Sequence, residues 1–538
     1  MHAWRPRNAV QFGLVAGPLL FLAVFFAWPV GELLVRGLGV AGTSIGAVLG
    51  TGSIRSAIWF TFWQAALSTV LTLLVAFPLT WALSNFTFPG RRVVRAFVAV
   101  PFVLPTVVVA GAFIATADRV GLTDGPFALA GSVFAILVAH VFFNVAVVVR
   151  TVGSFWSQLS SDDEHAARML GASTVRTFFT VTLPRLRPAI AAAVAIVFLF
   201  TFTSFGVVLI LGSSRQRTIE TEIFRYAISR TDFGTAAVLS VVQLVTVLVL
   251  VVINQRIRGR LTGASRITLD RARPIVGLRQ RILVLGAVGV TAALLAVPVV
   301  SLIDQSLQSG GGWSLAHYRA LADRPPFLTV SPLRAIGNSL FFAAVAALLA
   351  TTIGGWAAVA IAFSRRSISR AVDLAFLLPL GTSAVTLGFG VLLAFDTGVL
   401  DLRQSWIMIP LVQSLVGVPF VTRAVAPVLL AIDPHLREAA SSLGAEPRRV
   451  LRDIDLPIAR RAVTVGAGFA FAVSLGEFGA TSFVGRRPDF MTVPLAIARL
   501  LSQPGQQIRG QAMALSVILM VLTTAVLLTL DRSDRTVL

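Results

Sequence analysis

Long apolar stretches separated by short arginine-bearing loops constrain this fold more than any other feature of the sequence. A helix that crosses the hydrocarbon core of a bilayer needs about 20 apolar residues, and twelve stretches reach or approach that length. Since 56% of the 538 residues are hydrophobic, against about 45–50% in soluble domains, we predict an all-α integral membrane protein with about 12 transmembrane helices. The predicted helices lie near residues 12–30, 57–83, 96–117, 128–149, 189–211, 233–252, 282–303, 335–363, 374–395, 404–422, 462–484 and 511–530.

The placement of the arginines predicts the topology. The net charge is +21 and all 45 basic residues are Arg, but they gather in alternate short loops, which is the positive-inside pattern of cytoplasmic loops and not the pattern of a nucleic-acid-binding surface. We therefore expect a multi-pass protein of the bacterial cytoplasmic (inner) membrane with both termini in the cytoplasm. The first apolar stretch is long and lacks a clear cleavage site, so we interpret it as a retained span. The clusters are Arg5 and Arg7; Arg91, Arg92 and Arg95; those between Arg150 and Arg187; eight between Arg256 and Arg281; Arg365, Arg366 and Arg370; those between Arg448 and Arg461; Arg532 and Arg535.

One group of charges departs from this pattern. Four arginines fall in a loop that the scheme places outside, where three acidic residues partly balance them. The four are Arg215, Arg217, Arg225 and Arg230, and the acids are Glu220, Glu222 and Asp232.

A polar segment occurs twice in the chain. His165–Pro184 returns 273 residues later as Glu438–Pro457, with no insertion and with identical residues that include both alanines, the leucine and glycine after them, and the final Leu-Pro. Each copy lies between the fourth and fifth predicted spans of its half, and an even number of spans per half gives the two halves the same orientation, as in parallel repeats. We therefore predict a first domain over 1–255, an Arg-rich linker over 256–281 and a second domain over 282–538, with the repeated segments at about 160–185 and 433–458.

The local chemistry of both segments predicts a helix, a glycine turn and a second helix. In the second copy Asp433 can be the N-cap and Pro434 the first helical residue, whereas in the first copy Ser161 and Glu164 have the spacing of a capping box. Both helices are expected to end at a glycine, Gly171 or Gly444. Small residues on each helix would permit close approach to a partner, namely Ala166, Ala167, Ala439 and Ala440. An ordinary amphipathic loop explains one copy, but not two in the same register.

Glu438 through Pro457 reads EAA, three residues, Gly, nine residues, I-x-L-P, and this resembles the coupling signature of the permease subunits of bacterial ABC importers. The resemblance covers essentially the whole chain and is strongest to the fused two-domain permeases of the ferric-iron and thiamine importers. Further strings point to the same group: AHVFFN at 139–144, FTSFGVVLILG at 202–212, TIETEI at 218–223 and SLGEFG at 474–479.

The resemblance implies a non-enzymatic permease that works by alternating access. Its implied partners are an extracytoplasmic substrate-binding protein and two copies of an ABC ATPase, which would bind ATP and Mg²⁺; no cofactor is expected in this chain, which lacks the Lys of a GxxxxGK[ST] loop. His165 occupies the position at which the family motif has Glu. The two repeated segments are therefore expected to contact the ATPase differently. The residues that we expect to couple to the ATPase are Glu164, His165, Ala166, Ala167, Gly171, Glu438, Ala439, Ala440 and Gly444.

Four polar residues in the predicted spans are candidates for the translocation pathway: His140, Asn144, Ser204 and Glu477. For His140 and Asn144 we favour interhelical hydrogen bonds over substrate contact, and a lone His does not indicate a metal site. Glu477 is either a cation-attracting group or, as we favour, an interfacial carboxylate paired with Arg486 or Arg487.

Two classes of transporter remain open. An ABC importer permease for a small cationic nutrient, thiamine or ferric iron, explains the repeated segments, and AHVFFN and TIETEI favour thiamine. The alternative is an ion-coupled secondary transporter with two parallel six-helix halves. Such a transporter would need several acidic residues within its spans, and Glu477 is the one clear case in this sequence. The sequence shows no cluster with catalytic spacing.

Overall fold

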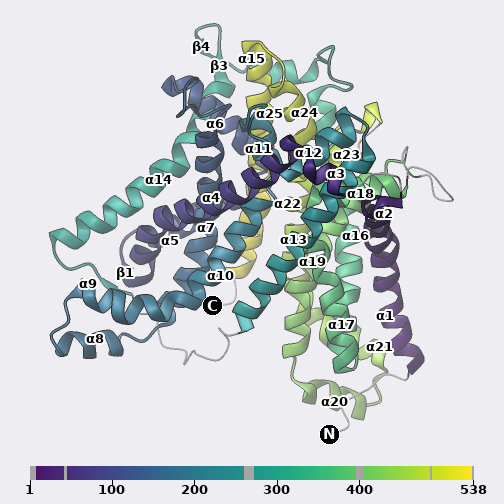
Figure 1. Ribbon diagram of the computed structural model, residues 1–538. Coiled ribbons are helices and arrows are strands. Elements are labelled where there is room, and N and C mark those ends of the chain that lie inside the picture. Colours follow the sequence, from purple (N-terminus) through teal and green to yellow (C-terminus); the bar gives the residue numbers. More distant parts are fainter. Residues whose placement is uncertain are drawn as a thin grey trace. The chain divides into compact units, whose positions relative to one another are not determined.

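The computed structural model is built almost entirely of helices and describes residues 8–40, 45–259, 272–395, 402, 405–484 and 487–535. In this part of the chain ten helices are long and apolar enough to cross a membrane. They match ten of the twelve predicted spans, and the predicted all-α membrane fold is confirmed. Figure 1 shows the helices coloured along the sequence, from purple at the N-terminus to yellow at the C-terminus.

The other two predicted spans are not single helices, and both are the third span of their half. The predicted span over 96–117 is split into α5 (Arg91–Val103) and α6 (Thr106–Val120), which meet at an angle of 105°. The cause is Pro105, because a residue before proline avoids the α-helical region, and Leu104 is extended with ψ of 136°. The span over 374–395 is split into α17 (Arg366–Leu377), a 3-10 turn η6 (Pro379–Gly381) and α18 (Ala384–Ala394), where Ser383 caps α18 by accepting from Thr386 N.

The described residues form two compact units, each with its own core. The α4 unit comprises the described residues of 50–222 and 245–308. Its elements are α4 (Gly52–Asn85), β1 (Phe86–Thr87), α5, α6, α7 (Val133–Gln158), α8 (Asp162–Met169), α9 (Thr174–Thr177), η3 (Phe178–Thr182), α10 (Leu183–Phe202), α11 (Gly206–Leu211), β2 (Arg273–Pro274) and α14 (Leu278–Leu307). Strands β1 and β2 pair in parallel, with Phe86 opposite Arg273.

The α16 unit comprises the described residues of 1–49, 223–244 and 309–538. Helices α12 (Ile219–Phe224) and α13 (Phe233–Gly259) each contribute residues to both units, and β3 (Gln308–Ser309) pairs with β4 (Gly312–Trp313). The remaining elements of the α16 unit are α1 (Asn8–Leu22), η1 (Ala23–Ala27), α2 (Trp28–Val35), η2 (Arg36–Val40), α3 (Ile45–Gly50), η4 (Arg225–Ser229), α15 (Ala316–Arg319), η5 (Ala320–Ala322), α16 (Pro332–Phe363), α17, η6, α18, α19 (Met408–Ala431), α20 (Pro434–Ser442), α21 (Pro447–Val450), η7 (Leu451–Asp455), α22 (Leu456–Gly476), α23 (Thr481–Val484), η8 (Pro488–Phe490), α24 (Val493–Leu501) and α25 (Gln506–Arg535).

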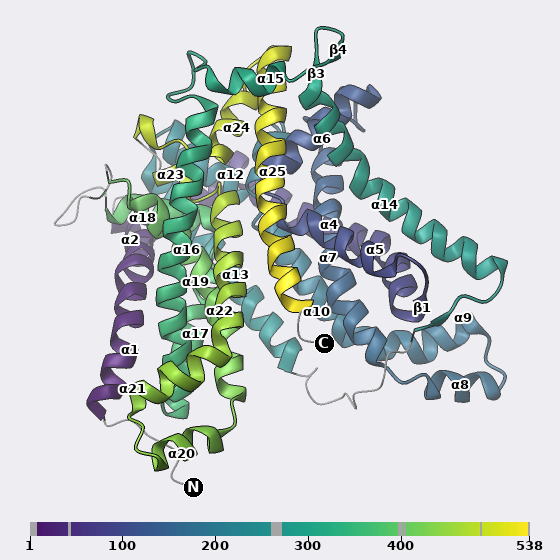
Figure 2. The ribbon, with the colours of Figure 1, turned by 180° about the vertical axis from the view of Figure 1, so that it is seen from behind.

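These units divide the chain differently from the predicted sequence halves, because the first span of each half packs with spans of the other half. In the α16 unit, α1 runs beside α16 (Figure 2), and Leu22 and Phe26 belong to one apolar core with residues of α16, α19 and α22. In the α4 unit, α14 packs on α4 and α6, and Arg119 of α6 lies 3.5 Å from Asp304 of α14. The halves 1–255 and 282–538 stay a prediction about the sequence repeat, and residues 260–271 of the predicted linker lie outside the described residues.

Candidate coupling segments and polar sites

Both repeated segments form a short helix, a glycine turn and a second helix, as predicted. Helix α8 is followed by Gly171 with φ of +83° and by α9 (Figure 1), and α20 is followed by Gly444 with φ of +79° and by α21. A side chain rarely adopts such a φ, which is why glycine ends these helices.

The two glycine turns share the same hydrogen bonds. Gly171 N donates to Arg168 O at 2.9 Å, and the following residue, Ala172, donates to Ala167 O at 3.0 Å. In the second copy Gly444 N donates to Ser441 O and Ala445 N donates to Ala440 O, both at 3.0 Å. This is a Schellman motif in each copy, so the likeness seen in the sequence extends to the backbone.

The helix starts differ between the copies. In α20 the Asp433 carboxylate accepts from His435 N at 3.0 Å, and Pro434 is the first helical residue, as predicted. The same carboxylate bonds to the His435 ring at 2.8 Å, which raises the pKa of the imidazole, while the backbone N–H of His435 is the main cause that lowers the pKa of the Asp433 carboxyl.

The capping box predicted for α8 is wrong. Ser161 occupies the N-cap position but its side chain makes no capping bond there, and Ser160 Oγ accepts from Asp162 N at 3.1 Å instead. The Glu164 carboxylate accepts a hydrogen bond from Thr182 Oγ1 at 2.6 Å.

This Glu164–Thr182 bond has a counterpart in the second copy. The residues 273 positions later are Arg437 and Asp455, and Arg437 Nε lies 2.8 Å from Asp455 Oδ1. In each copy, the same two positions join the first short helix to the turn before the next span. The contact is a hydrogen bond between a hydroxyl and a carboxylate in the first copy and an ion pair in the second. Sequence reasoning missed both contacts. The one available signal was that two positions 18 residues apart carry complementary polar groups in each copy.

Arg437 makes further contacts that fix α20 to the spans of the α16 unit. Its guanidinium donates to Leu429 O of α19 at 2.8 Å and lies 4.9 Å from the centre of the Phe363 ring at the end of α16. With Asp455 before α22, this one side chain touches the ends of three spans.

The motif residues themselves point away from the protein. His165 and Glu438, which occupy equivalent positions, are exposed, and neither α8 nor α20 contains a buried residue. The leucine before each glycine is almost fully exposed, at 88% for Leu170 and 89% for Leu443. Two apolar side chains at equivalent positions therefore lack a covering surface within the described residues.

The structure places His140 between three helices of the α4 unit. Its Nδ1 lies 3.0 Å from Ser68 Oγ of α4, and its Nε2 lies 2.9 Å from Ser204 Oγ, just after α10. The predicted interhelical hydrogen bonds are thus found for His140. Asn144 differs from the expectation, because its Nδ2 donates to His140 O within α7.

Glu477 lies in the break between α22 and α23, not inside a membrane-spanning helix as predicted. Its carboxylate accepts from Ala480 N at 2.7 Å and from Thr481 N at 2.9 Å, and it bonds to the Thr481 hydroxyl. The favoured pairing with Arg487 is not observed, since the Arg487 guanidinium lies over the Phe490 ring at 5.5 Å; Arg486 is outside the described residues. The carboxylate therefore organises the start of α23. Among the described residues no three His, Cys, Asp or Glu side chains converge on a possible metal position.

Comparison with known proteins identifies the class. The family model described as the binding-protein-dependent transport system inner membrane component matches residues 75–262 and again residues 325–537. Since these matches cover most of the chain, the protein belongs to this family and is a multi-pass permease of the inner membrane, with one family domain in each sequence half.

Curated relatives align over most of the chain. A thiamine transport system permease protein of Brucella abortus is 26% identical over 490 residues, which cover 88% of this chain and 87% of the relative. The thiamine transport system permease protein of Escherichia coli is 25% identical over 454 residues, 81% of each chain. A probable ABC transporter permease protein of Sinorhizobium fredii is 25% identical over 459 residues, which cover 80% of this chain and 79% of the relative.

Proposed function

We propose that this permease imports thiamine, and that two copies of an ABC ATPase drive it by docking on α8–α9 and α20–α21. Thiamine is favoured over ferric iron because two of the relatives above are named for thiamine transport, and because the chain aligns with them over both halves. An extracytoplasmic binding protein delivers the substrate, in keeping with the family description. The family assignment argues against the ion-coupled secondary transporter.

The observation that carries the docking proposal is the matched exposure of Leu170 and Leu443. A leucine that is nearly nine-tenths exposed on a rigid glycine turn is a poor surface residue but a suitable anchor for a partner groove. Both leucines stand on helices without buried residues, and both turns have the same hydrogen bonds. Two docking elements with the same glycine turn suit two copies of one ATPase, with both elements and both termini in the cytoplasm.

In this mechanism ATP and Mg²⁺ bind to the ATPase, and closure of the two ATPase copies moves the docked helices. The Glu164–Thr182 and Arg437–Asp455 contacts transmit that movement, because they tie α8 and α20 to the turns that begin the fifth span of each half. The spans then alternate between inward-open and outward-open states.

Replacing Gly444 by Asp tests the docking proposal. The substitution strains a residue with φ of +79° and adds a carboxylate to the docking surface, but an added Cβ meets no atom within 4 Å, so the chain still inserts. We expect uptake to fall at least about tenfold while ATP hydrolysis continues uncoupled, as a coupling free energy is lost. The measurement is uptake and ATPase activity of the assembled transporter in proteoliposomes.

The matched control is Gly121→Asp at the end of α6. Gly121 has φ of +75° and equally open surroundings but lies outside the repeated segments, so we expect this variant to keep its uptake. Normal uptake by Gly444→Asp, or an equal loss in the control, contradicts docking at this turn.

The substrate is tested separately from the coupling. Uptake of labelled thiamine and of ferric iron is compared in cells that contain the permease with its binding protein and ATPase, with ATP-depleted cells as the control. Thiamine uptake that requires ATP is expected; ATP-independent uptake that collapses with the ion gradient would support the secondary transporter instead.

A further inference from the structure

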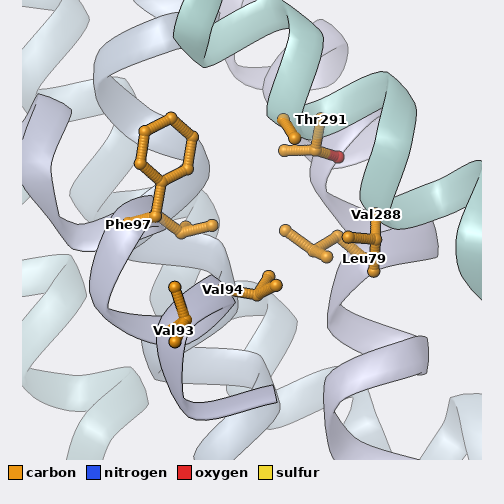
Figure 3. Close-up of a pocket in the computed structure, with 8 residues that line it drawn as sticks. Leu79, Val93, Val94, Phe97, Val288 and Thr291 are labelled. Carbon is orange, nitrogen blue, oxygen red and sulfur yellow. The ribbon is translucent and has the colours of Figure 1, made fainter. Parts of the chain in front are cut away.

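The α4 unit contains an apolar cavity of about 130 Å³ that lies between α4, α5 and α14. Figure 3 shows Leu79 of α4, Val94 and Phe97 of α5, and Val288 and Thr291 of α14 around one common space. Leu79 and Thr291 are buried, whereas Val93 at the rim is 71% exposed, so the cavity opens to the outside of the helices.

The chemistry of the lining disfavours ordered water as the occupant. The one polar side chain is Thr291, and its hydroxyl donates to Ala287 O at 2.9 Å within its own helix. The Thr291 oxygen can still accept a hydrogen bond, but a buried water typically makes about three, and the other lining side chains are apolar. An open apolar cavity between membrane-spanning helices suits a hydrocarbon chain.

One end of the cavity is strongly basic. Arg91, Arg92 and Arg95 lie within the first five residues of α5, directly before and among the residues that line the cavity. Arg91 and Arg95 also donate to Leu83 O, which holds their guanidinium groups at the end of α4. Arg279 and Arg281 begin α14, and Arg281 lies seven residues, or about 10 Å of helix, before Val288. The chain has no Asp or Glu between residues 86 and 117 or between 271 and 303.

The β1–β2 pairing brings these two basic groups to the same corner. Phe86, at the end of α4, pairs with Arg273, and the Arg273 guanidinium lies 5.7 Å from the centre of the Phe86 ring. The ends of α4 and the starts of α5 and α14 are therefore held together. Basic pockets between membrane helices are suited to the headgroups of anionic lipids.

We propose that this site binds one anionic phospholipid, with an acyl chain in the cavity and the phosphate at the arginines that begin α5 and α14. The lipid ties α14 to α4 and α5. This proposal is independent of the transported substrate and of ATPase docking.

Native mass spectrometry of the full chain in detergent tests the selectivity, with phosphatidylglycerol and phosphatidylcholine of the same acyl chains as probes. We expect phosphatidylglycerol to bind more tightly. The double variant Arg279→Gln/Arg281→Gln should weaken its binding about fivefold per arginine, the factor that corresponds to ~1 kcal/mol for each basic residue near an anionic lipid surface. The matched control, Arg366→Gln/Arg370→Gln, removes two arginines from α17, the counterpart of α5 in the other half, and should leave binding unchanged.

The acyl-chain position is tested on a single cysteine, since the chain contains no Cys. A bimane label on Val93→Cys, at the rim of the cavity, should be quenched more by phosphatidylglycerol with an acyl-chain nitroxide than by the same labelled phosphatidylcholine. A label on Val290→Cys, which is 69% exposed and does not line the cavity, should show equal quenching by both lipids. Equal binding of the two lipids, an equal loss in the α17 control, or equal quenching at Val93→Cys would overturn the proposal.

Discussion

At the scale of single residues, the two halves make the same contact with different chemistry. Arg437 and Asp455 form an ion pair in which the side chains are 16% and 1% exposed, while Glu164 and Thr182 form a hydrogen bond at the equivalent positions. A buried carboxylate needs a partner, because an uncompensated buried charge is strongly destabilising. Both members of the contact therefore differ together between the two copies. Glu164 corresponds to Arg437 and is not a displaced version of the motif residue Glu438.

Exchange of the pair tests this equivalence. Arg437→Glu places a second carboxylate against the buried Asp455 and should lower the free energy of unfolding by ~3–5 kcal/mol. Addition of Asp455→Thr recreates the pair of the first copy and should recover most of that loss. About 1 kcal/mol stays lost, because the bond to Leu429 O is gone. The measurement is thermal unfolding of the purified variants, and a double variant no more stable than Arg437→Glu would refute the equivalence.

Residue-level sequence reasoning succeeded where a rule depends on neighbours in the chain. The glycine turns at Gly171 and Gly444 and the Asp433 cap follow from local backbone chemistry, and the structure confirms them. The contacts of Glu164 and Glu477 were not predicted. Each carboxylate could bond either to the partner expected from the sequence or to groups that the chain brings near after the helix, and the choice depends on how the chain turns there. For Glu477, the chain turns so that its own next residues provide the donors.

At the scale of elements, hydropathy gave the apolar segments but not their breaks. The summed hydropathy of 20 residues does not show where a helix bends or breaks. The segments 96–117 and 374–395 were therefore predicted as single spans. Pro105 was visible in the sequence and is the local cause of the first break. In the second segment Leu378, before Pro379, stays helical, and the chain becomes extended at Thr382 and Ser383. The glycines of these segments then allow close contact, since a Cβ on Gly388 of α18 would lie 2.6 Å from Ala480 Cα.

Gly388→Ala tests that close contact. Because the clash is with the backbone after Glu477, it cannot be relieved by a side-chain rotation, and we expect a loss of ~1–3 kcal/mol of stability from overpacking. Gly355→Ala in α16 is the matched control, since its Cβ would meet no atom within 4 Å and alanine favours a helix by ~1 kcal/mol. The measurement is the thermal unfolding of both variants. If Gly388→Ala is as stable as the parent chain, α18 is not packed tightly against the backbone between α22 and α23.

At the scale of the whole molecule, the exchange of first spans could not be read from the sequence. The repeat indicates where the halves begin, but it carries no information on contacts between the first span of one half and the spans of the other half. Leu33 of α2 lies 3.0 Å from the Cβ position of Gly390, and Gln305 of α14 donates to Ala115 O of α6 at 3.0 Å. Each family domain thus completes its packing with a helix from the other sequence half, which gives a reason for the two domains to occur in one chain.

Cleavage of the linker tests this dependence. A protease site inserted within 260–271 allows the purified full chain to be cut, and we expect the two fragments to elute together in mild detergent, because separation would expose both the α1 face of the α16 unit and the α14 face of the α4 unit. Gly17→Leu should lower the temperature at which the cut fragments separate, since its Cβ would lie 2.2 Å from the Trp356 ring. Gly13→Leu is the control, because nothing lies within 4 Å of its Cβ position. Fragments that separate while the uncut chain stays folded would show that the exchanged helices do not hold the halves together.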